Sequence, residues 1–186
     1  MHKPLIIGIT GPFGSGKTTA AQFFEKKGLK KIILSSFLGD ELINKGELVT
    51  RINLQDLGNK LRKKFGRAIL AKKALERVKK EKLNKTVVDG LRNVGEIEYL
   101  RKNSNFILIG IVCDKKIRFE RIRNKKGREK LNFALFEKLD YRDLGINGED
   151  SGLQVAKCLA LSDHFIESNE GYDEFFKDLE SLFNKL

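Results

Sequence analysis

The chain has 186 residues, of which 40% are hydrophobic and 33% charged. This length fits one domain with a sizeable core, and this proportion of hydrophobic to charged residues excludes a disordered chain. No apolar run approaches the roughly 18 residues needed to span a bilayer, so we expect no membrane partner. Cys113 and Cys158 are the only cysteines. We expect two separate buried thiols and not a disulfide, which makes the cytoplasm the expected compartment.

The net charge of +12 favours phosphate-rich partners, such as nucleotides, nucleic acid or an anionic membrane surface. Basic residues concentrate in segments 60–85 and 115–130, whereas the chain is acidic from Glu167 onward. Neither basic segment has the interleaved aromatic residues of a base-stacking surface. Nucleic acid therefore stays an alternative partner that the sequence does not favour.

The first half of the chain combines short apolar strands with amphipathic helices. Residues 5–9 are predicted to form a buried parallel strand, and residues 18–27 the helix that follows it. A second strand is expected at 31–34. From residue 37 to residue 78 the pattern is helical, with Leu57, Leu61 and Phe65 spaced four apart.

Two further strands are expected at 86–88 and 106–113, and a helix begins near residue 117 with Asp114 as its N-cap. Residues 123–130 are rich in Arg, Lys and Gly and have no clear period. A helix at 153–161 and a fifth strand at 164–166 follow. The last helix carries an apolar stripe of Phe175, Phe176, Leu179, Leu182 and Phe183.

Strands that alternate with helices in this way predict one α/β domain. Its five strands should form a parallel sheet that helices cover on both faces.

One motif carries specific chemistry. Gly11, Gly16, Lys17 and Thr18 fit the pattern G-x-x-x-x-G-K-[ST] between the first strand and the first helix. Glycines let the backbone N–H groups converge on phosphates, and the positive end of the helix dipole points at the same anion. Lys17 should reach the β- and γ-phosphates, and Thr18 should bind Mg²⁺. The loop residues expected to bind ATP are Gly11, Phe13, Gly14, Ser15, Gly16, Lys17, Thr18 and Thr19.

Magnesium needs a second anchor, usually an acidic residue at the end of a neighbouring strand. Asp89 and Asp114 each follow a predicted strand. Asp114 has an adequate structural role as a helix cap. Asp89 is followed by Gly90 and a non-helical step, so its carboxylate should face the strand ends where ligands collect. We therefore predict Thr18 and Asp89 as the metal ligands.

With these features the chain resembles the nucleoside monophosphate kinase group of P-loop proteins, which includes dephospho-coenzyme A kinases. The resemblance covers nearly the whole chain. Asp89-Gly90-Leu91-Arg92 is similar to the Asp-Gly-Phe-Pro-Arg step of adenylate kinases, whose arginine holds substrate phosphate, although the proline is missing here. The resemblance implies a three-layer P-loop fold with one kinase domain over residues 1–186. It also implies an acceptor-binding helical insert at about 36–82 and a small Arg-rich lid at about 123–150.

The resemblance places the lid arginines, which close over the transferring phosphate, at Arg118, Arg121, Arg123 and Arg128. Phosphoryl transfer depends mainly on positioning and charge neutralisation, which suits a mobile basic loop. We favour Arg121 and Arg123 because they lie where the helix ends and the loop begins. Arg128 and Arg142 are weaker candidates. For each of these arginines the alternative is an ordinary solvated position on the surface. The expected catalytic residues are Lys17, Asp89, Arg92, Arg121 and Arg123.

The resemblance further implies that the segment from Ser168 to Gly171 lies beside the adenine base, which adds Asn169 and Gly171 to the ATP site. Leu34-Ser35-Ser36 and Gly39-Asp40 resemble the start of the acceptor-binding region. Arg51, Asp56 and Arg62 lie in the same region and are alternatively plain surface charges. The expected acceptor-binding residues are Ser35, Ser36, Asp40, Arg51, Arg62 and Arg92.

The absence of one carboxylate indicates which kind of acceptor to expect. A hydroxyl acceptor must lose a proton, which a carboxylate base assists, and dephospho-coenzyme A kinases carry an Asp-x-Asp step where this chain has Leu34-Ser35-Ser36. We therefore expect transfer of the γ-phosphate of ATP to a nucleoside or deoxynucleoside monophosphate. Transfer to a hydroxyl compound such as dephospho-coenzyme A, with Asp40 as the substitute carboxylate, is the alternative.

A function from another class also stays open, namely a P-loop ATPase or switch that acts with a nucleic acid. The charge of +12 favours it modestly. The chain has no Asn/Thr-Lys-x-Asp step of the GTPases and no RNA-binding signature, which both speak against it. No oligomeric state follows from the sequence.

Overall fold

The computed structural model describes residues 3–123, 130–146 and 148–186. Its centre is a sheet of parallel strands in the order β2-β3-β1-β4-β5. The strands are β1 (Leu5–Thr10), β2 (Lys30–Ile33), β3 (Lys85–Asp89), β4 (Asn105–Val112) and β5 (His164–Glu167). The predicted five-stranded parallel sheet is confirmed, and its carboxyl-terminal edge brings the ends of β1, β3 and β4 together.

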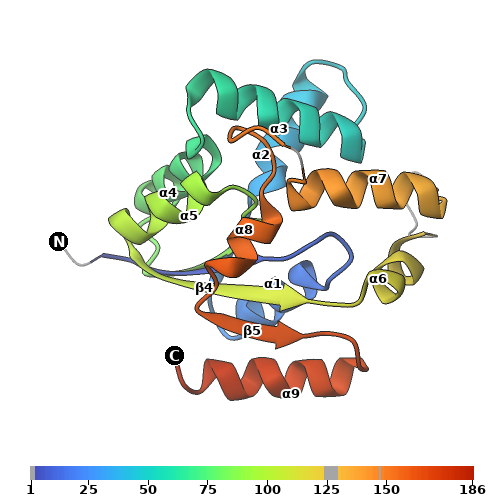
Figure 1. Ribbon diagram of the computed structural model, residues 1–186. Coiled ribbons are helices and arrows are strands. Elements are labelled where there is room, and N and C mark those ends of the chain that lie inside the picture. The colour runs from blue at the N-terminus through green and yellow to red at the C-terminus, as the bar shows by residue number, and fades with distance from the viewer. Residues whose placement is uncertain (1–2, 124–129, 147) are drawn as a thin grey trace.

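Helices cover both faces of the sheet, as Figure 1 shows. They are α1 (Lys17–Lys26), α2 (Leu34–Asn44), α3 (Arg51–Phe65), α4 (Ile69–Lys80), α5 (Val94–Asn103), α6 (Lys115–Ile122), α7 (Phe133–Leu144), α8 (Val155–Ala160) and α9 (Tyr172–Phe183). Helices α1 and α9 lie under the sheet in this view, whereas α4, α5 and α8 lie above it. The fold is therefore the three-layer α/β arrangement that the sequence predicts.

The two faces of the sheet have separate cores because neighbouring strand residues point to opposite sides. Ile6 belongs to the core shared with α2, α3, α4 and α5, whereas Ile7 belongs to the core shared with α1 and α9. Phe175, Leu179 and Leu182 are buried in this second core, with Phe176 and Phe183 packed against it. The apolar stripe predicted for the last helix is thus confirmed.

Two local predictions were wrong. Leu34 was assigned to the second strand, but β2 ends at Ile33 and α2 begins at Leu34, so that the buried Leu34 side chain packs into the core from a helix. Phe65 was expected on the same apolar face as Leu57 and Leu61. Those leucines are buried, whereas Phe65 is half exposed at the end of α3, just before Gly66 ends the helix.

A third cluster sits over the glycine loop. Phe13 of that loop packs against Phe136 of α7, with ring centroids 5.0 Å apart, and Ile122, Leu131 and Leu139 complete the cluster. Helices α6 and α7 are therefore anchored to the loop by apolar contacts. They belong to the segment predicted as the lid, of which residues 124–129 and 147 lie outside the described residues.

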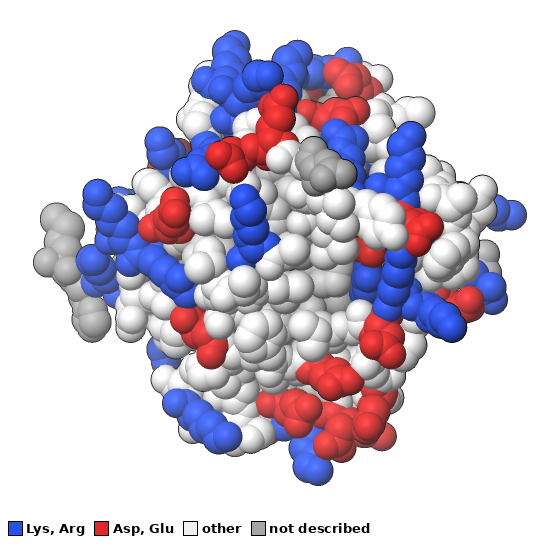
Figure 2. All heavy atoms as spheres, viewed as in Figure 1, with Lys and Arg blue, Asp and Glu red and all other residues white. Residues whose placement is uncertain are grey.

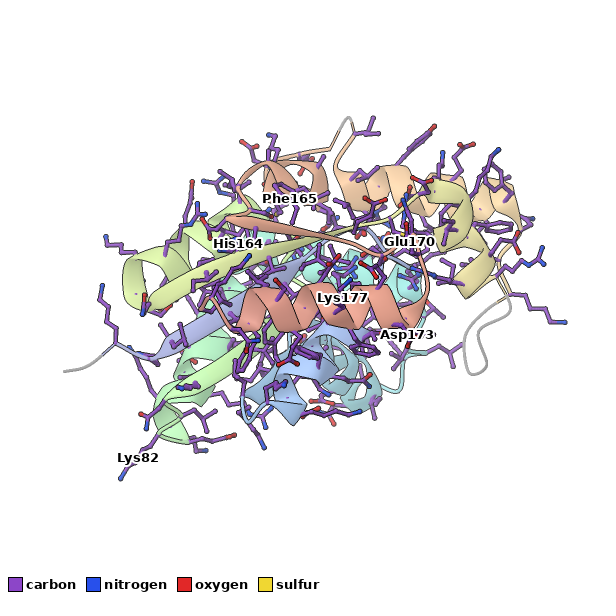
Figure 3. All side chains as sticks on the ribbon, turned by 90° about the horizontal axis from the view of Figure 1, so that it is seen from below. Lys82, His164, Phe165, Glu170, Asp173 and Lys177 are labelled. Carbon is purple, nitrogen blue, oxygen red and sulfur yellow. The ribbon has the colours of Figure 1, made fainter. Side chains whose placement is uncertain are left out.

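The surface charge is uneven. On the face drawn in Figure 2, acidic side chains gather near α9 at the bottom, while lysines and arginines predominate at the top. Figure 3 shows the molecule from below, with His164 and Phe165 on the edge strand β5 and Lys82 in the turn before β3. In the described part of the chain, no helix is long and apolar enough to cross a membrane.

Candidate active site

The glycine loop joins β1 to α1 and follows the backbone path that the motif requires. Gly11, Gly14 and Gly16 have φ angles of 143°, 83° and 99°, in the region that side chains other than glycine rarely adopt. A Cβ atom on Gly11 would also lie 2.3 Å from the carbonyl oxygen of Ile111 in β4. The loop therefore needs glycine at this position for two reasons, its own conformation and its close approach to the neighbouring strand.

Lys17 is the first residue of α1, and its side chain is buried. Its ammonium group donates a hydrogen bond to the carbonyl oxygen of Pro12 at 2.7 Å, so the side chain folds back along the loop. Burial, followed by the positive charge of Arg92, lowers the pKa of Lys17 to about 7. A bound anion would restore the charge on this lysine.

Thr18 and Asp89 meet at the end of β3. The Thr18 hydroxyl donates a hydrogen bond to Asp89 Oδ2 at 3.0 Å, and Asp89 is buried. A hydroxyl and a carboxylate oxygen are the hard ligands that Mg²⁺ takes, together with phosphate oxygens and water. The two predicted metal ligands are thus adjacent, and their chemistry fits magnesium.

Asp114, the competing anchor, is exposed at the start of α6. It occupies the predicted N-cap position, but its side chain makes no capping hydrogen bond. Its backbone N–H instead donates to Asn169 Oδ1 at 2.7 Å.

Arg92, in the turn between β3 and α5, forms an ion pair with Asp143 near the end of α7. Asp143 is fully buried, and its second oxygen, Oδ2, has no hydrogen-bond partner among the described residues. The backbone N–H of Arg92 donates to Glu96 Oε2 at 2.8 Å, which fixes the turn. A buried carboxylate with one unpaired oxygen therefore lies beside the arginine predicted to hold the acceptor.

Arg51 begins α3 and lies over the ring of Phe13, with its guanidinium carbon 4.1 Å from the ring centroid. This contact brings the start of α3 against the glycine loop. Ser35 and Ser36 lie in the first turn of α2, where the Ser36 hydroxyl donates to the carbonyl oxygen of Ile33 at 2.7 Å. Asp40 is exposed further along α2.

Arg62 is placed differently from the other predicted acceptor residues. It is buried, and its Nη2 atom lies 2.9 Å from Glu96 Oε1, whose side chain is also buried. This pair joins α3 to α5 and already neutralises the arginine. Arg62 lines a small pocket together with Arg51 and Arg92, but its charge is neutralised by Glu96.

The predicted lid arginines have three different surroundings. Arg118 is buried and holds Asp140 of α7 with two hydrogen bonds of 2.5 and 2.9 Å, and its Nη1 also donates to the carbonyl oxygen of Phe13 at 3.2 Å. Arg121 donates to the Ser168 hydroxyl at 3.0 Å. Arg118 and Arg121 therefore tie α6 to α7, to the glycine loop and to the segment after β5.

Arg123 pairs with Glu120 of the same helix, at 3.0 Å. Arg128 lies outside the described residues. Arg142 pairs with Asp56 across the gap between α7 and α3. The catalytic role of these arginines stays a prediction.

The segment after β5 closes the other side of the glycine loop. The Ser168 hydroxyl donates to the carbonyl oxygen of Ser15 at 2.6 Å, and Asn169 bridges to Asp114. Gly171 is exposed at the start of α9, near the labelled Glu170 and Asp173 in Figure 3. The predicted adenine segment thus adjoins the loop, although the contact is made by Ser168.

Sequence reasoning missed two residues of this site, Asp143 and Gln55. Asp143 follows Asp140 by three residues, which puts both carboxylates on one face of α7. Gln55 follows Arg51 by four residues on α3, which is the same kind of helical spacing. In both cases the spacing was visible in the sequence, but nothing in the sequence showed which elements those faces meet.

Comparison with known proteins places the chain in a family. A family model described as AAA domain matches residues 7–144. The chain is 30% identical over 181 residues to a UPF0200 protein of Sulfurisphaera tokodaii, with 97% of both chains covered. It is 28% identical over 186 residues to a UPF0200 protein of Methanocaldococcus jannaschii, covering 98% of this chain and 90% of the relative.

Solved structures with the same fold include small kinases. TT1252 from Thermus thermophilus matches with a TM-score of 0.63 and 16% identity, covering 100% of this chain and 99% of that one. Shikimate kinase from Acinetobacter baumannii, in complex with shikimate, matches with a TM-score of 0.58 and 17% identity, covering 98% and 94%. The fold is that of the P-loop kinases, and the chain belongs to the AAA domain family and to the UPF0200 proteins.

Proposed function

We propose that this chain transfers the γ-phosphate of ATP, with Mg²⁺, to a nucleoside or deoxynucleoside monophosphate. One observation carries the proposal. Arg51 lies over Phe13 of the glycine loop, Asp89 accepts a hydrogen bond from Thr18, and Arg92 pairs with Asp143. The charges of these four side chains also influence the pKa of Lys17. They come from the β3–α5 turn, from α7, from the end of β3 and from the start of α3, so charged side chains of four separate segments gather around the lysine of the glycine loop.

The donor side supplies charge neutralisation. Lys17 and the N–H groups of the glycine loop would bind the phosphates, with Thr18 and Asp89 holding the metal ion. Bound Mg²⁺ neutralises negative charge on the phosphate oxygens. Ser168 supports the loop through the hydrogen bond that its hydroxyl donates to the carbonyl oxygen of Ser15.

The acceptor side carries positive charge and therefore favours an anionic acceptor. Arg51 and Arg92 flank the glycine loop and present two guanidinium groups, which bind phosphate through several parallel hydrogen bonds. In the ligand-free protein Asp143 pairs with Arg92. An acceptor phosphate would compete with this carboxylate for the arginine. An acceptor that brings its own negative charge needs these cations and needs no base.

A hydroxyl acceptor is the second candidate, and Asp143 favours it. The carboxylate that the sequence lacks after β2 is present here on α7, buried, with Oδ2 unpaired among the described residues. A carboxylate of this kind can take the proton of a hydroxyl group during transfer. Its other oxygen is already engaged by Arg92 in an ion pair, which is why we rank this candidate second.

A phosphotransferase assay tests the ranking. Radiolabelled γ-phosphate of ATP is followed into nucleoside monophosphates, deoxynucleoside monophosphates, dephospho-coenzyme A and shikimate, the ligand of the similar structure. We expect transfer to at least one monophosphate, and none with the Lys17→Ala variant, whose circular dichroism should match the wild type. Transfer to dephospho-coenzyme A or shikimate alone would overturn the proposed acceptor.

The same preparation tests the nucleic-acid alternative. ATP hydrolysis that needs no small acceptor but rises with added RNA or DNA would replace the kinase proposal with an ATPase. Binding that survives about 0.2 M salt in a gel-shift assay would support that outcome, because purely electrostatic attraction weakens steeply with salt.

A further inference from the structure

A small pocket beside Arg92 holds one polar side chain that nothing in the described structure satisfies. Gln55 of α3 is 5% exposed, and neither its amide nitrogen nor its amide oxygen has a hydrogen-bond partner among the described residues. Leaving such groups unpaired in a protein interior is costly, and native structures contain few of them. A buried amide with both ends unpaired points to a ligand that completes it.

Leucines form the apolar part of this pocket's wall, and Ser35, Gly90 and three arginines contribute to the rest. Gln55 lines it together with Leu34, Leu38, Leu54, Leu70 and Leu153. The volume of about 90 Å³ equals the liquid volume of about three water molecules, at ~30 Å³ each, so the pocket has room for one small ring and not for a whole nucleotide. A flat ring with apolar faces and a polar edge suits leucine walls with a single amide between them.

Charged side chains also line this pocket. Arg51 and Arg92 line it, and both also act on Lys17 at the glycine loop. Gln55 lies one helical turn after Arg51, which places the two residues on one face of α3, about 6 Å apart along the helix axis. The two arginines could bind a phosphate near the donor loop, and the Gln55 amide, one helical turn further, could contact a ring of the same molecule.

Arg62, the other polar side chain deep in the pocket, is already paired. Its guanidinium group binds the buried Glu96 carboxylate through Nε at 3.0 Å and Nη2 at 2.9 Å. It therefore forms a fixed wall of the pocket and offers no uncompensated charge to a ring. Gln55 is left as the group that can select a ligand.

We propose that Gln55 recognises the base of the acceptor nucleotide through its amide, while Arg51 and Arg92 hold the phosphate. The inference rests on the proposed function and assigns the selection among acceptor bases to one residue, Gln55. An amide offers one acceptor and two donors in a plane, so it can form two parallel hydrogen bonds with a base edge that presents a donor beside an acceptor. A polyhydroxylated ring offers no such planar edge and would contact the leucine walls with polar groups.

The test compares selectivity among acceptors. Binding of AMP, GMP, CMP, UMP and dTMP is measured by calorimetry without ATP, and transfer by steady-state kinetics with ATP. We expect wild-type protein to prefer one base by on the order of 10-fold or more, as one bidentate pair can supply. In Gln55→Leu this preference should fall to within about threefold while KM for ATP is unchanged.

Gln55→Glu supplies a second measurement, because it keeps the shape but replaces the amide donor by an acceptor. The preferred base should change in this variant. Gln55→Asn retains the amide and should restore part of the preference if its shorter side chain still reaches the base. Gln22→Leu, the same substitution at an exposed position of α1, should keep the wild-type preference.

The outcomes separate the inference from the function. If wild-type protein transfers phosphate to one monophosphate selectively and all Gln55 variants keep the same ranking, the inference is wrong and the function stands. If base-selective binding depends on Gln55 but no phosphate is transferred, the inference stands and the function is wrong. Equal binding of all bases by the wild type overturns the inference directly.

Discussion

Arg92 and Asp143 form an ion pair that joins the turn after β3 to the last part of α7, next to the glycine loop. The Asp143 side chain has no exposed surface, whereas that of Arg92 is 22% exposed. Loss of the arginine and loss of the carboxylate should therefore affect the stability of the fold to different extents. The arginine can reach water, but the carboxylate cannot.

This asymmetry predicts the stability of variants at the two positions. Arg92→Ala leaves a buried carboxylate without its cation, and we expect a loss of roughly 3 kcal/mol in the free energy of unfolding. Asp143→Asn keeps the volume and leaves a cation that water can solvate, so about 1 kcal/mol should be lost. Urea unfolding followed by circular dichroism measures both.

The double variant Arg92→Ala with Asp143→Asn provides the control. Its loss should be smaller than the sum of the two single losses by about 1 kcal/mol or more, because the neutral amide no longer needs the arginine. Strict additivity would show that the two side chains do not stabilise each other.

Asp89 should determine the magnesium dependence of the reaction. The Asp89 carboxylate is buried and contacts Thr18 at 3.0 Å, whereas Asp114 is exposed at the start of α6. We expect Asp89→Asn to lower kcat/KM at least 10- to 100-fold and to raise the magnesium concentration for half-maximal activity. Asp114→Asn should stay within about twofold of the wild type. The reverse order in a magnesium titration would identify Asp114 as the anchor.

The sheet and the donor loop followed from the sequence because both depend on local signals. Continuous apolar runs mark parallel strands, and the spacing of Gly11, Gly16, Lys17 and Thr18 fixes the loop between the first strand and the first helix. The end of β3 could also be predicted, because parallel strands bring their carboxyl ends to one edge. Asp89 therefore lies beside Thr18 as expected.

The acceptor side followed only in part because it depends on how helices pack. Arg62 has the same charge as Arg51, yet its burial against Glu96 gives it a structural partner that sequence spacing did not reveal. Asp143 lies in a segment expected to be a basic lid, and only the packing of α7 over the glycine loop brings it to Arg92. Long-range pairing of this kind leaves no periodic trace in the chain.

Arg118 and Arg121 should behave differently although the resemblance implies a lid position for both. Arg118→Met leaves the buried Asp140 carboxylate without its two hydrogen bonds, so we expect a loss of about 3–5 kcal/mol in unfolding free energy. Arg121 is exposed, and Arg121→Met should change stability by less than about 0.5 kcal/mol. If Arg121 acts in transfer, as predicted, its variant lowers kcat at nearly constant stability.

Thermal unfolding and steady-state kinetics on both variants distinguish these expectations. A stable Arg118→Met protein would mean that its contacts with Asp140 contribute little to the fold. An Arg121→Met protein with unchanged kcat but a raised KM for ATP would assign Arg121 to the support of Ser168 and remove it from the catalytic residues.

Lys17 should take up a proton when ATP binds. Burial lowers its pKa to about 7 in the ligand-free protein, so at pH 8 most molecules carry a neutral amine. The negative charge of a bound triphosphate favours the ammonium form and raises this pKa again. Binding at pH 8 should therefore take up close to one proton per site, and affinity should fall by up to tenfold per pH unit above pH 7.

Calorimetric titration of the protein with ATP in buffers of different ionisation enthalpy measures this uptake. The apparent binding enthalpy should change with the buffer for wild-type protein, with a slope near one proton. Lys17→Arg is the matched control, because a guanidinium group stays charged at pH 8 and has no proton to gain. A binding enthalpy independent of the buffer would show that Lys17 is already charged before the nucleotide arrives.

The lowered pKa of Lys17 also means that burial of the charged lysine destabilises the fold below pH 7. This cost is relieved as the pH rises from 7 towards 10.5.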